Sequence, residues 1–323
     1  MTIERPMPPT AFRPRRRRLK SLAFLPSLLT VGNLLCGFAA IHFALRAMHE
    51  FGAGIQDEHF RTLNSVQLER ILPSWLSVAC GLVLIGMLFD CFDGLIARVT
   101  CSITQFGAQL DSLADVITCG AAPAVLLVTF MTQQLAGESI LPSPVSEHFL
   151  GRATWISAAV YLAFSAIRLA RFNVENARSD HDYRTFRGLP SPGAAALIVT
   201  FILFHEHVVQ TSPLAAGVAV YAMPAVAIAT AFLMVSRIPY RRFHRAYLVG
   251  RKPFGHLVVF LAVFAVFWSY KAPTLLVLVA WYWASGPVEW TFRKLRGRRA
   301  ASLVPESSPV AEASTDWRIA GGE

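Results

Sequence analysis

The sequence predicts an all-α integral membrane protein, folded as a polytopic bundle of about eight transmembrane helices. Three observations predict this class. First, 54% of the 323 residues are hydrophobic and only 15% are charged, which is too apolar for a soluble domain of this length. Second, apolar stretches near the length that crosses about 30 Å of hydrocarbon recur along the chain. Third, the basic residues are distributed unevenly between the connections that would lie on the two sides of a membrane.

Charges, Pro or Gly bound each apolar stretch, and these boundaries set the expected helices. The helices are expected at residues 22–45, 74–97, 110–132, 153–171, 189–207, 214–236, 255–270 and 272–290. The last two are equally consistent with a single re-entrant hairpin. The first stretch is too long for a signal-peptide core and lacks a clear cleavage site, so we expect it to remain as the first helix.

The formal net charge of +10 is explained by membrane topology. With the amino terminus in the cytoplasm, 25 of the 30 basic residues fall on the cytoplasmic side. The outer side holds only Arg46, Arg61, Arg70, Arg152 and Lys271. This asymmetry follows the positive-inside rule, so the basic run near the amino terminus is interpreted as a juxtamembrane segment rather than an RNA-binding arm. Nucleic acid is therefore not an expected partner.

Composition divides the chain into three parts. Residues 1–20 are expected to form a basic cytoplasmic segment, residues 21–292 the transmembrane domain, and residues 293–323 a cytoplasmic tail. The tail is rich in Ser, Pro, Ala and Glu, which predicts disorder.

The segment with the clearest chemistry reads DCFDGLIARVTCSITQFGAQLDSLAD. It places four carboxylates, Asp90, Asp93, Asp111 and Asp115, at the ends of two consecutive membrane helices. A carboxylate at the membrane centre costs roughly 2.5 to 3.5 kcal/mol on insertion scales, so four together require a compensating charge. A bound cation supplies that charge.

The spacing of these carboxylates predicts that they converge. Asp90 and Asp93 lie three residues apart, and Asp111 and Asp115 lie four apart, so each pair projects from one face of its helix. The linker at residues 100–106 is short enough to make the two helices antiparallel neighbours, with both pairs at the cytoplasmic end. Several hard oxygen ligands suit Mg²⁺ or Mn²⁺, and no His or Cys cluster suggests zinc.

Small and basic residues accompany the carboxylates. Gly94 and Gly107 leave room for a ligand to approach the backbone, and Arg98 is placed to pair with a phosphate. A helix cap or an interfacial charge explains any single Asp equally well, but it does not explain the whole pattern. Eight positions match DxxDGxxARx8GxxxDxxxD without a gap: Asp90, Asp93, Gly94, Ala97, Arg98, Gly107, Asp111 and Asp115. In this pattern the chain resembles the CDP-alcohol phosphatidyltransferase family.

The resemblance implies a metal-dependent reaction in which an alcohol displaces CMP from a CDP-linked lipid. It implies that Asp90, Asp93 and Asp111 ligand two Mg²⁺ or Mn²⁺ ions, with Asp115 as both ligand and general base. It also implies that the CDP-diacylglycerol site is shaped by Gly94, Ala97, Arg98 and Gly107. A homodimer in the bacterial inner membrane, with its active site facing the cytoplasm, is expected on the same basis.

Four further segments resemble bacterial members of the family that use serine as acceptor. They are residues 25–41, 111–124, 167–175 and 186–196. The expected reaction therefore transfers the phosphatidyl group of CDP-diacylglycerol to the hydroxyl of L-serine, giving phosphatidylserine and CMP. Arg168 and Arg171 share a helical face and are expected to bind the serine carboxylate, unless they only enforce topology or contact lipid phosphates. Asn173 is a weaker candidate, and Thr30 and Asn33 are either polar packing groups or substrate contacts.

Two alternatives remain open at this point. Another CDP-alcohol phosphatidyltransferase, forming phosphatidylcholine or phosphatidylglycerolphosphate, would use the same carboxylates. A divalent-cation transporter would also place acidic residues in membrane helices, but it predicts them deep in several helices rather than gathered at one end of two.

Overall fold

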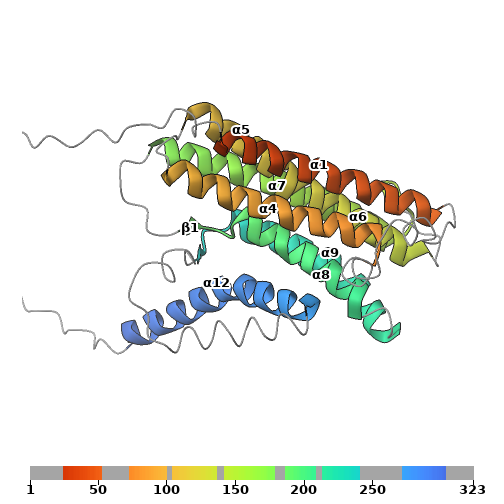
Figure 1. Ribbon diagram of the computed structural model, residues 1–323. Coiled ribbons are helices and arrows are strands. Elements are labelled where there is room, and N and C mark those ends of the chain that lie inside the picture. The colour runs from red at the N-terminus through yellow and green to blue at the C-terminus, as the bar shows by residue number, and fades with distance from the viewer. Residues whose placement is uncertain are drawn as a thin grey trace, which may run out of the picture.

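Long helices make up nearly all of the chain that the computed structural model describes, which comprises residues 25–52, 73–99, 104–136, 142–178, 186–208, 213–240 and 271–302. The elements in order are α1 (Leu25–Gly52), α4 (Trp75–Val99), α5 (Gln105–Asp115), the π-helix η2 (Val116–Ala121), α6 (Ala122–Leu135), α7 (Phe149–Arg178), β1 (Phe186–Arg187), α8 (Ser191–Val208), α9 (Pro213–Val235), β2 (Pro239–Tyr240) and α12 (Lys271–Ser302). Figure 1 shows α1, α4, α6 and α7 lying side by side along a common direction, with α12 at an angle to them.

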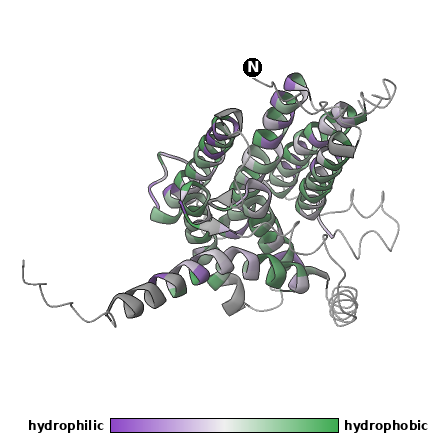
Figure 2. Ribbon diagram, turned by 90° about the vertical axis from the view of Figure 1, so that its left-hand side faces the viewer, coloured by the Kyte–Doolittle hydropathy of each residue, from purple (hydrophilic) through white to green (hydrophobic). Residues whose placement is uncertain are grey.

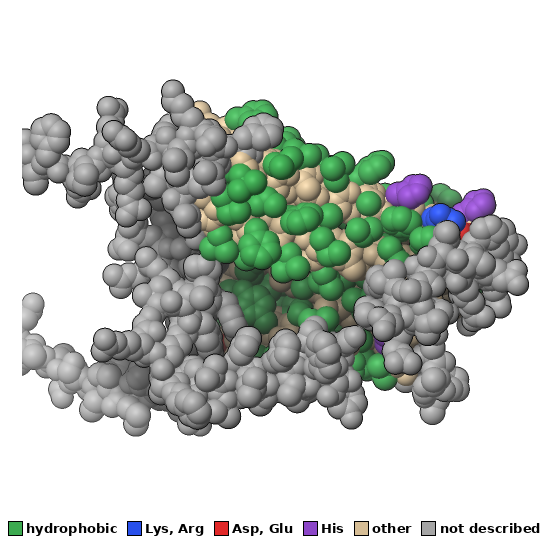
Figure 3. Space-filling model, in the orientation of Figure 1, with side chains coloured by type: hydrophobic (Ala, Val, Ile, Leu, Met, Phe, Trp, Pro, Cys, Tyr) green, Lys and Arg blue, Asp and Glu red, His purple; other side chains and the backbone are tan. Residues whose placement is uncertain are grey.

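Six helical segments are long and apolar enough to cross a membrane. They are Leu25–Gly52, Trp75–Ala97, Gln105–Leu135, Phe149–Glu175, Ser191–Val208 and Gly217–Val235. They correspond to the first six expected helices and confirm an α-helical, polytopic membrane protein. Hydrophobic side chains cover much of the face formed by α1 and α4 (Figure 3), and most residues along the ribbons of the bundle are hydrophobic (Figure 2). An apolar outer surface is what contact with lipid requires.

The carboxyl-terminal part of the expected topology differs from the observed helices. The helix expected at 255–270 lies outside the described residues. The helix expected at 272–290 corresponds to α12, which has 32 residues and continues to Ser302. The domain boundary expected at 292 therefore falls inside a continuous helix, and residues 303–323 of the expected tail lie outside the described residues.

The third expected helix begins earlier than expected and contains a π-helical turn. Thr104 caps α5 by accepting a hydrogen bond from the backbone N–H of Gly107 at 3.0 Å. Beyond Asp115 the chain continues as η2, in which a wider turn leaves backbone carbonyls available to other helices. The hydroxyl of Tyr161 on α7 donates to one of them, the carbonyl of Cys119, at 2.8 Å.

The start of α8 is tied to the end of α9 at the end of the bundle where α4 finishes. β1 pairs with β2 in antiparallel orientation, and the N–H of Gly188 donates to the carbonyl of Ile238 at 2.9 Å. Gly188 has φ of +85°, which only glycine adopts readily. A Cβ at this position would also lie 2.9 Å from the carbonyl oxygen of Ser236. Glycine is therefore required for the chain to enter α8 here.

Helix α12 packs on α8 and is anchored to α9 and β2. The hydroxyl of Tyr240 donates to the carbonyl of Trp283 at 3.0 Å, and the indole N–H of Trp283 donates to Thr230 Oγ1 at 3.2 Å. The ring of Tyr240 packs against the backbone at Gly286, where any side chain would overlap it. These contacts bring Tyr282 against Gly193 near the start of α8.

Candidate active site

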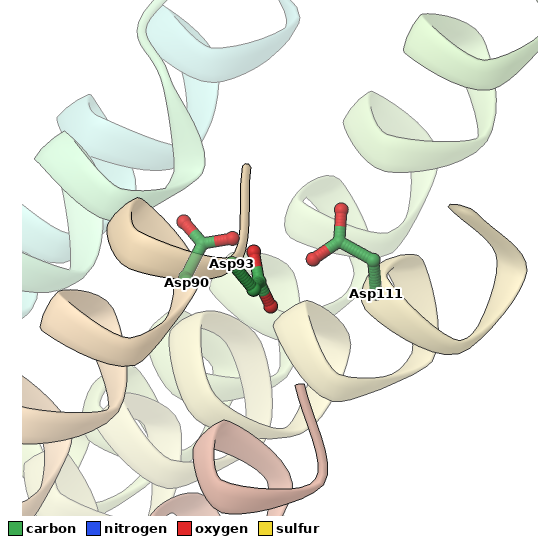
Figure 4. A group of neighbouring side chains, drawn as sticks. All are labelled: Asp90, Asp93 and Asp111. Atoms are coloured by element: carbon green, nitrogen blue, oxygen red, sulfur yellow. The ribbon is translucent and has the colours of Figure 1, made fainter. Parts of the chain in front are cut away.

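Three carboxylates meet where α4 ends and α5 begins. Asp90 and Asp93 project from α4, and Asp111 projects toward them from α5 (Figure 4). One oxygen from each carboxylate lies within 4.8 Å of the other two. We call these three residues the acidic cluster. Its members come from the two antiparallel helices whose spacing predicted convergence.

Among the described side chains, no basic group compensates the charge of the acidic cluster. Asp93 is buried, with 5% of its surface exposed, and Asp90 and Asp111 are half-buried. Within the described part of the chain, no Lys or Arg forms an ion pair with these carboxylates. The buried oxygen Oδ1 of Asp111 also finds no hydrogen-bond partner there. Three like charges this close repel one another unless a cation lies between them.

These observations fit a divalent metal ion. The donor set consists only of carboxylate oxygens, which suits Mg²⁺ or Mn²⁺ and does not suit a softer metal. The unpartnered oxygen of Asp111 lies in the cluster as a ligand atom would, since a buried polar atom without a partner is otherwise costly.

Asp115 lies outside the acidic cluster. It is the last residue of α5, one turn beyond Asp111, and is 9% exposed. Its oxygen Oδ1 accepts a hydrogen bond from Asn33 Nδ2 on α1 at 3.3 Å. It also lies within electrostatic reach of Arg168 on α7. Asp115 is therefore not part of the group within 4.8 Å, although it lies within electrostatic reach of Asp90 and Asp111. Its expected roles as ligand and base stay predictions.

Helix α1 contacts both the cluster and Asp115. Thr30 Oγ1 donates to Asp93 Oδ2 at 2.7 Å and also lies 3.0 Å from the carbonyl oxygen of Pro26. From the sequence these polar residues of the first helix had two interpretations, packing or substrate contact. The structure places Thr30 and Asn33 directly against two of the four signature carboxylates.

The small signature residues lie beside the cluster. A Cβ at Gly94 would meet no described atom within 4 Å, so the backbone there faces open space. A Cβ at Gly107 would lie 3.0 Å from Thr104 Oγ1, so glycine also allows the close cap of α5. Ala97 and Arg98 lie in the last turn of α4. The side chain of Arg98 is outside what the structure describes.

The structure separates the two arginines expected to bind the serine carboxylate. Arg168 points into the bundle, where its guanidinium donates to the hydroxyl of Ser191 at the start of α8. Arg171 forms an ion pair with Glu175 at 2.8 Å, and its other nitrogen lies 3.5 Å from the carbonyl of Val235. Arg168 therefore faces the side of Asp115, whereas Arg171 lies at the surface.

Two side chains at this end had no assigned role in the sequence analysis. Ser191 lies in the segment 186–196, which resembles serine-using family members, but the resemblance predicts no role for Ser191 itself. Ser112 of α5 receives a hydrogen bond from Asn173 Nδ2 at 2.9 Å. This contact ties α5 to α7, so Asn173 has a structural partner that its sequence position did not indicate.

The family and the relatives that this chain resembles are ones whose reaction such a site could serve. The sequence profile of the CDP-alcohol phosphatidyltransferase family matches residues 23–235. A protein of Helicobacter pylori named CDP-diacylglycerol--serine O-phosphatidyltransferase is 32% identical over 219 residues, which cover 67% of this chain and 80% of that relative. Proteins of the same name are 27% identical over 274 residues in Mycobacterium leprae, covering 83% and 74%, and 26% identical over 222 residues in Bacillus subtilis, covering 69% and 92%.

The bundle and its acidic cluster define a polytopic membrane enzyme with a site suited to divalent metal. The chain belongs to the CDP-alcohol phosphatidyltransferase family. It is a transferase of phospholipid biosynthesis, and its family depends in general on divalent metal ions. The divalent-cation transporter is therefore set aside as an alternative.

Proposed function

We propose that this enzyme transfers the phosphatidyl group of CDP-diacylglycerol to the hydroxyl of L-serine, forming phosphatidylserine and CMP. The acidic cluster carries the proposal, because a pyrophosphate needs bound cations to approach carboxylates in a membrane protein. The names of the relatives support serine as the acceptor.

Asp90, Asp93 and Asp111 would hold the metal. Two Mg²⁺ or Mn²⁺ ions bound there would neutralise the pyrophosphate and stabilise the attacking and leaving oxygens of an in-line displacement. The open space beside Gly94 leaves room for the CDP group next to this cluster. Ala97, Arg98 and Gly107 would complete that side of the site.

Asp115 would act as the general base. A serine hydroxyl is a poor nucleophile at neutral pH, so its attack needs a proton acceptor within hydrogen-bond reach. The serine oxygen forms a bond to the phosphorus that carries the diacylglycerol, and the bond from this phosphorus to the CMP oxygen breaks. The hydroxyl proton passes to Asp115, and CMP leaves with the bridging oxygen.

Arg168 is the better placed of the two arginines to bind the serine carboxylate. It lies in the bundle interior within electrostatic reach of Asp115 and Tyr282. A guanidinium can donate two parallel hydrogen bonds to a carboxylate, which orients the acceptor as well as binding it. Arg171 already pairs with Glu175, so it is a weaker candidate.

The enzyme is expected to lie in the bacterial inner membrane with this end of the bundle in the cytoplasm, and to form a homodimer. Arg168 and Arg171 lie at the end that carries the acidic cluster, whereas Arg46 and Arg152 lie at the opposite end of their helices. The homodimer is tested by measuring the mass of the purified protein in detergent.

An acceptor screen tests the proposed reaction. Purified protein is incubated with CDP-diacylglycerol, Mn²⁺ or Mg²⁺ and, separately, labelled serine, glycerol phosphate, inositol and choline. We expect labelled phosphatidylserine and release of CMP only with serine. Preferential labelling with another alcohol would assign a different acceptor, and absence of product with all four would contradict the transferase activity.

A further inference from the structure

Helix α1 carries two buried polar side chains, and each reaches a different signature carboxylate. Thr30 is 4% exposed and Asn33 is fully buried. Thr30 bonds to Asp93, a member of the acidic cluster, and Asn33 bonds to Asp115, which lies outside it. Each of the two donors therefore holds a different carboxylate, one inside the acidic cluster and one outside it.

Packing does not account for the amide of Asn33. Its oxygen Oδ1 is buried and has no hydrogen-bond partner among the described residues. Leaving such an atom unpaired costs about 1 to 3 kcal/mol. Leucine has the same branched shape and would avoid this cost, so hydrogen bonding alone favours an apolar residue here. What the amide adds is its NH₂ group, and that group points to Asp115.

The backbone around Asn33 leaves its side chain little freedom. A Cβ at Gly86 of α4 would lie 2.9 Å from Asn33 Oδ1, so the amide is pressed against that helix. The carbonyl of Asn33 accepts a hydrogen bond from Thr118 Oγ1 of η2 at 2.9 Å. Asn33 is thus fixed by α4 on one side and by η2 on the other, which makes it a rigid donor.

We propose that Asn33 is a positioning residue whose amide holds one oxygen of Asp115, so that the other oxygen is presented to the acceptor hydroxyl. The proposal rests on the proposed function in that Asp115 is taken as the base. Thr30 has the corresponding role for Asp93, on the metal side. Helix α1 thereby holds one carboxylate from each of the two signature pairs.

A double-mutant cycle tests this role. Asn33→Leu, Asp115→Asn and the double variant are compared in kcat, in KM for both substrates and in the Mn²⁺ concentration for half-maximal rate. We expect Asn33→Leu to lower kcat by about tenfold to a hundredfold, as misplacement of a reacting group does, with KM and Mn²⁺ dependence nearly unchanged. In the Asp115→Asn background the same change should have almost no further effect, because Asn33 acts through Asp115.

Other variants separate this role from structure and from metal binding. Thr118→Val removes the hydrogen bond to the Asn33 backbone but leaves the amide in place, so it should lower kcat less than Asn33→Leu does. Thr30→Val should instead raise the Mn²⁺ requirement. If Asn33→Leu does not fold, Asn33→Ala replaces it in the cycle, with the apparent melting temperature measured for each variant.

Three results would overturn the proposal: an unchanged kcat in the Asn33 variants, an equal loss in both Asp115 backgrounds, or a loss that excess Mn²⁺ restores. Failure of the base assignment is distinguishable, since Asp115→Asn alone would then keep its rate or be rescued by Mn²⁺. Failure of the serine assignment would appear in the wild-type acceptor screen, and the cycle would be run with the acceptor found there.

Discussion

At the scale of single residues, the site depends on which neighbour each carboxylate meets. Three of them approach one another within 4.8 Å, and the fourth is held by an amide. A carboxylate in a group of like charges is suited to bind a cation, whereas a separate one with a free oxygen is suited to accept a proton. Identical side chains thus acquire different expected roles from their surroundings.

The metal-binding role predicts how the cluster responds to neutralisation. Asp90→Asn and Asp111→Asn each keep the size of the side chain but remove a charged ligand. We expect the Mn²⁺ concentration for half-maximal activity to rise by at least about tenfold, and excess EDTA to abolish wild-type turnover. Titrations of activity against Mn²⁺ measure this. Full turnover in EDTA, or an unchanged titration in both variants, would contradict the metal site.

The two arginines of α7, Arg168 and Arg171, provide a test variant and its control for binding of the serine carboxylate. Arg168→Ala should raise KM for serine by about tenfold or more, because a charged hydrogen bond contributes roughly 1.5 to 3 kcal/mol, while KM for CDP-diacylglycerol changes little. Arg171→Ala is the control, since Arg171 pairs with Glu175 at the surface. Steady-state kinetics with each substrate varied in turn measure both. An equal rise in both KM values for Arg168→Ala would favour a purely topological role.

At the scale of elements, the segments with irregular backbone are the ones that shape the site. The π-helical turn η2 follows Asp115 directly, and bonds from Tyr161 and Thr118 hold it. The turn at Gly188 brings Ser191 to Arg168 at the start of α8. A regular helix or an ordinary residue at these points would move α8 and α5 relative to α7.

Gly188→Ala is therefore expected to destabilise the protein. The left-handed backbone alone costs an ordinary residue about 1 to 2 kcal/mol, and the added Cβ would also overlap the carbonyl oxygen of Met234. The matched control is Gly217→Ala in α9, where a Cβ would meet no described atom within 4 Å. There alanine should be neutral or slightly stabilising, as in most helices. Apparent melting temperatures in detergent compare them, and equal shifts would contradict the requirement for glycine.

At the scale of the whole molecule, the acidic cluster lies toward the end of α4, and Arg168 lies in the second half of α7, where it reaches the start of α8. The end of α4 and the segment that leads into α8 lie on the same side of the bundle (Figure 1). On the proposed function, serine and CMP would reach and leave the site from the aqueous side of that end. The positive-inside distribution of basic residues predicts that this end faces the cytoplasm.

Single cysteines in a cysteine-free background test the orientation. Val145→Cys lies in the exposed connection before α7, at the end opposite the cluster, and should react with a membrane-impermeant thiol reagent in intact cells. Glu175→Cys lies near the other end of the same helix and should react only after the cells are opened. The reverse labelling pattern would contradict the predicted topology.

The local pattern of the sequence determined the six spanning helices and the residues of the acidic cluster. Hydropathy over about 20 residues is enough to predict a span, because lipid leaves no partner for unpaired backbone groups. The spacing of the four carboxylates predicted that both pairs converge, and three of them, Asp90, Asp93 and Asp111, lie within 4.8 Å of one another. The resemblance to a family then indicated which reaction such a cluster serves.

The tertiary structure decided what depends on contacts between helices that are distant in the chain. Arg168 and Arg171 are about 60° apart around one helix, and only the packing of α8 and α9 shows that one enters the bundle and the other pairs at the surface. Pro123 is a local reason for the irregular turn, because it has no N–H to bond the carbonyl of Cys119, but only packing provides Tyr161 of α7 as the partner of that carbonyl. Asn33 reaches Asp115 across 82 residues, so its sequence position predicts a polar side chain in an apolar helix but not its partner.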